Sequence, residues 1–118
     1  AGSFDAIARM RAFDAEIIVP GHGPVCTPSV FDELESYYRF VQDTAVEMKA
    51  SGTSPLEAAR QLDLGSFDEL TDSERIVGNL HRALYELDGG ENGGPMNVAA
   101  AIGDMVAYND GKPLRCLA

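Results

Sequence analysis

The stretch EIIVPGHGPV, residues 16–25, sets the fold expected of this chain, because it joins an apolar run to a proline and a glycine-flanked histidine. Residues 17–19 are β-branched and predict a short buried strand, which ends at Pro20 because proline cannot donate a hydrogen bond to a neighbouring strand. The glycines on both sides of His22 allow backbone dihedrals that other residues avoid. The imidazole of His22 is therefore predicted to project from the end of a strand.

A helix is expected on the N-terminal side of this strand. Ser3 is a candidate N-cap, and apolar residues at helical spacing follow it up to Phe13. A helix followed by a strand is typical of one half of a layered α/β structure. A stable sheet needs about three strands, yet no second strand of comparable quality follows. Because the chain also opens at Ala1 without a methionine, we expect a piece of a larger domain whose other strands lie outside it.

After the histidine loop the pattern becomes helical. A long helix is predicted over residues 28–52, where apolar side chains recur at steps of three and four. A shorter helix follows, opened by a capping box of Ser54 and Glu57. A further helix is predicted over residues 71–89, where glycines end it.

These elements suggest a division of the chain into four segments. Residues 1–26 form a helix–strand unit that ends in the Pro-Gly-His-Gly loop, and residues 27–88 form a helical subdomain. Residues 89–95 are rich in glycine and are interpreted as a flexible linker. Residues 96–118 hold a last helix, capped by Asn97, and a tail.

Charge and composition narrow the classes of partner. The chain has 19 acidic and 9 basic residues and a formal net charge of -10, which opposes binding to nucleic acid or to an anionic membrane surface. No apolar stretch reaches the roughly 20 residues that span a bilayer, and no signal segment opens the chain, so the cytoplasm is the expected location. Cys26 and Cys116 are too few and too far apart for a disulfide framework or a zinc knuckle, and two reduced thiols are expected.

His22 is the one residue singled out as a candidate metal ligand. The histidines and cysteines show none of the close spacings typical of a metal site. His81 lies among apolar helix positions, where a partly buried structural histidine is the favoured interpretation. The carboxylates are spread along polar helix faces, no glycine-rich loop precedes a helix as in phosphate sites, and no serine nucleophile motif occurs.

The loop of residues 17–25, with a helix before it and a long helix carrying Tyr37 and Tyr38 after it, resembles the C-terminal part of a metallo-β-lactamase-superfamily hydrolase. The resemblance implies that this mainly α chain, a helix–strand unit plus a helical subdomain, is a C-terminal fragment of an α/β fold, the αββα sandwich. It also implies that His22 is the last ligand of a dinuclear zinc site. Residues 28–87 resemble the helical extension of glyoxalase-like members.

The other ligands of the family do not occur here. Its His-x-His-x-Asp-His signature, a middle histidine and a bridging aspartate all precede this loop in family members. A catalytic zinc takes at least three protein ligands, so one imidazole cannot hold it. The resemblance therefore implies a parent enzyme that hydrolyses a small-molecule ester, thioester or lactam with metal-bound hydroxide. The chain alone is expected to bind no zinc and to be inactive.

A second interpretation is a helical binding or dimerisation module without catalytic activity, in which His22 is only a turn residue. A bare turn does not require Gly-His-Gly, so the enzyme interpretation is preferred. Tyr37 and Tyr38 can line a substrate mouth or, as is more common at this spacing, pack in the core. The unpaired strand at residues 17–19 predicts self-association of the fragment, because it exposes backbone groups and apolar side chains.

Overall fold

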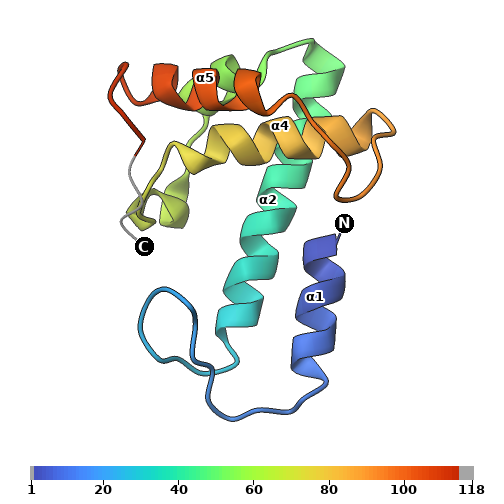
Figure 1. Cartoon of the computed structure of the whole chain (residues 1–118), viewed down its shortest axis with the longest axis vertical. Coiled ribbons are helices and arrows are strands. Elements are labelled where there is room, and N and C mark those ends of the chain that lie inside the picture. Colours follow the sequence, from blue (N-terminus) through green and yellow to red (C-terminus); the bar gives the residue numbers. More distant parts are fainter. Residues whose placement is uncertain (1, 115–118) are drawn as a thin grey trace.

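Five α-helices and one short 3-10 helix make up the computed structural model, which describes residues 2–114 (Figure 1). Their bounds are α1 Gly2–Arg11, α2 Val30–Ser51, α3 Pro55–Gln61, η1 Gly65–Glu69, α4 Arg75–Leu87 and α5 Val98–Tyr108. Within this range no strand is formed, and the predicted mainly α character is confirmed. None of the helices described is long and apolar enough to cross a membrane.

Three helix boundaries that were predicted from sequence are confirmed. In the capping box that opens α3, Ser54 Oγ accepts a hydrogen bond from the Glu57 backbone N–H at 3.3 Å, and the Ser54 N–H donates to Glu57 Oε2 at 3.2 Å. Asn97 Oδ1 accepts from the Ala100 N–H at 3.1 Å and caps α5. Gly52 ends α2 with a left-handed φ of 72°.

At the other predicted helix starts, the helix forms without a capping hydrogen bond from a side chain of these segments. Ser3 lies inside α1, which begins one residue earlier, so its hydroxyl is not the cap. The hydroxyls of Thr27 and Ser29 bond to each other at 2.9 Å, and α2 begins at Val30 with no side-chain cap. The helix predicted from residue 71 begins at Arg75, again without a side-chain cap. The hydroxyl-rich segments before α2 and α4 form turns.

The hydrophobic core lies where α2, α3, α4 and α5 meet. Val77 and Leu80 of α4 are fully buried at its centre. A Cβ at Gly78 would lie 3.1 Å from Met105 Sδ, so the glycine allows α5 to pack closely on α4. Because α5 contacts both α3 and α4, the segment after the glycine-rich loop belongs to the same bundle. The core cluster comprises Val41, Met48, Ala58, Ala59, Ile76, Val77, Leu80 and Met105.

The strand predicted at residues 17–19 is not formed. Ile18 and Cys26 make one isolated antiparallel bridge, in which the Ile18 N–H donates to Cys26 O at 2.8 Å and the Cys26 N–H donates to Ile18 O at 3.0 Å. Ile17 and Val19 are 67% and 75% exposed instead of buried. A β-branched run forms a strand only beside strands it can pair with, and this part of the chain supplies a single bridge. The predicted helix–strand unit is thus a helix and a loop.

The α1 helix and the N-terminal half of α2 extend away from the bundle, and the loop that joins them lies at the far end (Figure 1). Phe4 of α1 packs edge-on against Tyr38 of α2 with ring centroids 5.9 Å apart. Arg11 Nη2 lies 2.6 Å from Asp32 Oδ1 and ties the two helices together nearer the loop. The radius of gyration, 15.0 Å, exceeds the about 13.5 Å typical of a compact chain of this length.

The glycine-rich loop of residues 89–95 is attached to α4 at one point and to α1 at another. Arg82 Nη1 donates to Gly94 O at 2.8 Å, and its guanidinium lies 5.3 Å from the centroid of the Tyr85 ring. Asn92 Oδ1 accepts from the Gly2 N–H at 3.3 Å. These contacts bring the loop beside the start of α1.

Candidate functional site

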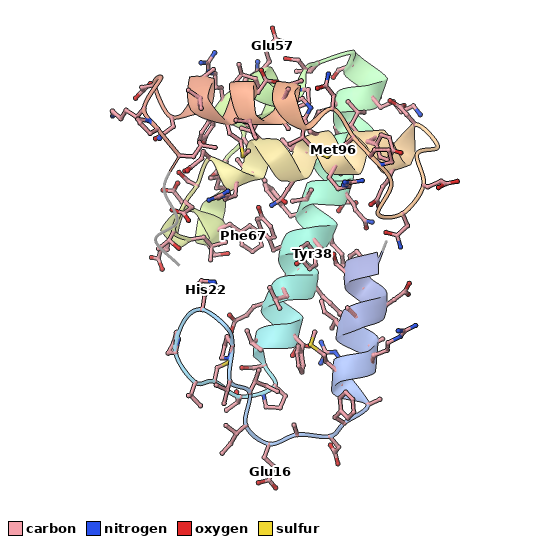
Figure 2. All side chains as sticks on the ribbon, in the orientation of Figure 1. Glu16, His22, Tyr38, Glu57, Phe67 and Met96 are labelled. Atoms are coloured by element: carbon pink, nitrogen blue, oxygen red, sulfur yellow. The ribbon has the colours of Figure 1, made fainter. Side chains whose placement is uncertain are left out.

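His22 lies on the loop between α1 and α2, which the Ile18–Cys26 bridge closes at its base (Figure 2). Its side chain is exposed and makes no hydrogen bond to any residue that the structure describes. Gly23 has a φ of +88°, a conformation that favours glycine, so one of the two flanking glycines is required by the backbone. The loop therefore presents an imidazole whose ring nitrogens are open to solvent.

The surroundings of His22 do not by themselves form a metal site. Across residues 2–114, no group of three or more His, Cys, Asp or Glu side chains is arranged to hold an ion. Cys26 is a free thiol whose Sγ lies 3.8 Å from Ile18 O, and Cys116 lies outside the described residues. The zinc that the resemblance implies needs three or more ligands, of which this loop offers one.

His81 lies away from this loop and joins two helices. Its Nε2 atom is 2.7 Å from Asp104 Oδ2, linking α4 to α5. The two side chains are 18% and 34% exposed, in line with the predicted partly buried structural histidine. Asp104 was not foreseen as its partner, because the two residues belong to separate predicted helices with no local signal to pair them.

A groove opens between the N-terminal half of α2, η1 and the start of α4. Its volume is about 790 Å³, and its lining includes Val30, the first residue of α2. Tyr37 and Phe67 form part of its wall, with ring centroids 5.3 Å apart. In the view of Figure 2, His22 extends from its loop toward the side of the molecule that carries Phe67.

Of the two roles considered for Tyr37 from sequence, packing in the core is the one observed. Its ring packs against the core cluster, and it also lines the groove. Asn79 Nδ2 donates to the Tyr37 hydroxyl oxygen at 2.8 Å. Burial raises the pKa of the Tyr37 phenol above its usual range, although the hydrogen bond from Asn79 acts in the opposite direction.

The groove was not foreseen as a site. Its wall on η1 comes from a segment that carried no helix prediction, and Asn79 was one of several polar residues on α4. One signal was present: Phe67 is an aromatic residue in the otherwise polar run of residues 65–69. Because an aromatic side chain has a large apolar area to bury, one in a polar run is a candidate for a contact with another element.

Comparison of the chain with protein-family models, with curated proteins and with solved structures gave no match. The metallo-β-lactamase resemblance therefore rests on the residues of the His22 loop and its flanking helices.

Proposed function

We propose that the chain is the C-terminal part of a zinc-dependent hydrolase of the metallo-β-lactamase type, in which His22 supplies one metal ligand. Such an enzyme acts on a small-molecule ester, thioester or lactam. Zinc in that enzyme supplies Lewis acidity at the scissile bond. The contribution of this chain is to hold one imidazole in place.

The observation that carries the proposal is the combination of an exposed histidine with exposed β-branched neighbours on one loop. Ile17, Val19 and Val25 are each at least 65% exposed, and they lie on the same loop as His22, on both sides of it. Such side chains are normally buried in a sheet, and the Ile18–Cys26 bridge already holds the backbone in an extended pairing. A parent sheet beside this loop would bury them and bring other metal ligands to the imidazole.

The test is the zinc content of the parent protein with His22→Ala. We expect one of the two zinc ions to bind more weakly, by about 10–100-fold or more. A loss of about 10–100-fold is typical when a residue that only hydrogen-bonds to a metal ligand is removed. His81→Ala is the matched control, because it removes the other histidine, which is paired with Asp104 on the far helices. Unchanged stoichiometry and affinity at both zinc sites in the His22 variant would contradict the proposal.

The alternative is a helical binding or dimerisation module. The exposed side chains of the same loop favour it, since an apolar surface can equally be covered by a second protein. The sequence encoded upstream of Ala1 separates the two functions. A His-x-His-x-Asp-His run there would support the hydrolase, and an upstream sequence that supplies no metal ligands would support the module.

A further inference from the structure

The groove between α2, η1 and α4 has the size and composition of a small-molecule site. Its volume of about 790 Å³ falls within the roughly 300–1,000 Å³ of ligand pockets. Leu64, Leu70 and Ile76 add aliphatic surface to its lining. Leu70 is 52% exposed, so apolar surface remains available for a ligand to cover.

The aromatic residues of the groove form a connected wall. The Phe67 ring lies 5.3 Å from Tyr37 at an interplanar angle of 76°. It also lies 5.3 Å from Phe40 at 45°, and Phe40 packs against the core cluster outside the groove lining. Tyr38 lines the same groove, with its ring centroid 6.0 Å from that of Tyr37. Rings in this arrangement present edges and faces to which another aromatic ring can pack.

The polar groups of the groove set the sign of charge that it accepts. Among the described residues, three carboxylates, those of Asp32, Glu33 and Asp72, and one guanidinium, that of Arg75, line the groove. Asp32 is paired with Arg11, and Asp72 lies 3.8 Å from Arg75. Glu33 has no ion pair with any residue in the described range, so no described side chain compensates its charge. An anion in this groove would be repelled and a cation attracted.

We propose that this groove binds a small aromatic amine, with the ring against Tyr37 and Phe67 and the ammonium group near Glu33. In this arrangement Asn79 donates to the Tyr37 hydroxyl oxygen and holds in place the ring against which the ligand packs. The proposal goes beyond the hydrolase function and does not depend on it, since no metal ligand is involved.

The test is titration of the full chain with phenethylamine, followed by amide NMR of the isotope-labelled protein. We expect saturable shifts at Ser66, Phe67 and Asn79, with a dissociation constant on the order of 1 mM. Hydrocinnamate has the same ring and a carboxylate at the end of its chain, and it should bind roughly three- to tenfold more weakly. Phenethyl alcohol, which is neutral, should fall between them.

Two pairs of variants test separately the part of the site that holds the ammonium group and the part that holds the ring. Glu33→Gln should abolish the preference for the amine, whereas Glu47→Gln, at an exposed position of the same helix outside the groove, should keep it. Phe67→Ala should weaken all three ligands, whereas Phe13→Ala, at an exposed residue outside the groove, should not. The NMR spectrum of each variant reports whether it is folded, and the Glu33 pair tests the proposal even if Phe67→Ala unfolds the chain.

Several outcomes would overturn the proposal. One is the absence of saturable shifts with phenethylamine, and another is equal affinity for hydrocinnamate. Shifts outside the groove would place the ligand elsewhere. Groove amides that move with protein concentration alone would show that the groove is a surface between copies of this chain.

Discussion

Tyr37 both packs against the core and makes a hydrogen bond with its hydroxyl. Its ring contributes to the bundle, and its hydroxyl holds the side-chain amide of Asn79, which comes from a different helix. Burial disfavours the phenolate and raises the pKa of the phenol. A group with a raised pKa stabilises the fold fully below its unfolded pKa, here about 10, and that contribution is lost as the pH rises toward the folded pKa.

Tyr37→Phe should therefore have two measurable effects. At neutral pH we expect a loss of about 1 kcal/mol in the free energy of unfolding, because the Asn79 amide loses its acceptor. In an alkaline titration followed by tyrosinate absorbance, the component that titrates at the highest pH should disappear. Tyr38→Phe, the neighbour on α2, should leave that component in place. A late-titrating tyrosine that persists in the Tyr37 variant would contradict the assignment.

Among the elements, α3 is short and depends on its N-terminal cap. Ser54 Oγ donates to Glu57 Oε2 at 2.7 Å in addition to accepting from the Glu57 N–H. The hydrogen bonds from the Ser54 side chain and backbone lower the pKa of the Glu57 carboxyl. A lowered pKa means that the contribution of Glu57 to stability is present above its unfolded pKa and is lost as the pH falls through the folded pKa.

Ser54→Ala is expected to cost about 1 kcal/mol of stability at neutral pH, the usual cost of losing a serine N-cap. The difference from the unmodified chain should shrink in acid, because the protonated Glu57 gains less from the serine hydroxyl. Urea unfolding followed by circular dichroism at neutral and acidic pH measures both. Ser36→Ala is the control: that hydroxyl bonds back to Asp32 O inside α2, and alanine there should be neutral or slightly stabilising. An equal cost at both pH values would refute the linkage to Glu57.

Features that depend on interactions within one turn could be predicted from the sequence, and features that depend on distant partners could not. The caps at Ser54 and Asn97 and the stop at Gly52 act within one turn, so their residues could be recognised locally. The strand at residues 17–19 could not be judged in that way, because a strand exists only with partners. Its β-branched residues carry the correct propensity, but one bridge to Cys26 is all the pairing they find in the described chain.

The same limit applies to the two sites. His22 could be singled out because glycines and prolines mark its loop in the sequence. The groove could not be predicted, because it depends on tertiary contacts between segments far apart in the chain. Tyr37 and Asn79 are 42 positions apart, and Phe67 joins them from the 3-10 helix between α3 and α4.

At the scale of the whole molecule, the apolar side chains are distributed unevenly. The bundle buries its core, whereas the extended end formed by α1 and the His22 loop leaves Phe13, Ile17, Val19 and Val25 at least 65% exposed. Full burial of each such side chain is worth about 1.5–3 kcal/mol. The formal charge of -10 opposes association of two copies at low ionic strength. Added salt screens that repulsion but does not reduce the free energy gained when the apolar side chains are buried.

The chain is therefore expected to self-associate through the loop end, more strongly as salt is added. Light scattering across a concentration series at low and high salt should show a mass that rises above that of a monomer. A double change, Ile17→Ser with Val19→Ser, should restore the monomer, because it removes apolar surface from the loop without touching the core. Val46→Ser is the control, since that side chain is 54% exposed on α2 but lies outside the loop. A clean monomer at high micromolar concentration and high salt would show that the exposed loop does not pair with a second copy.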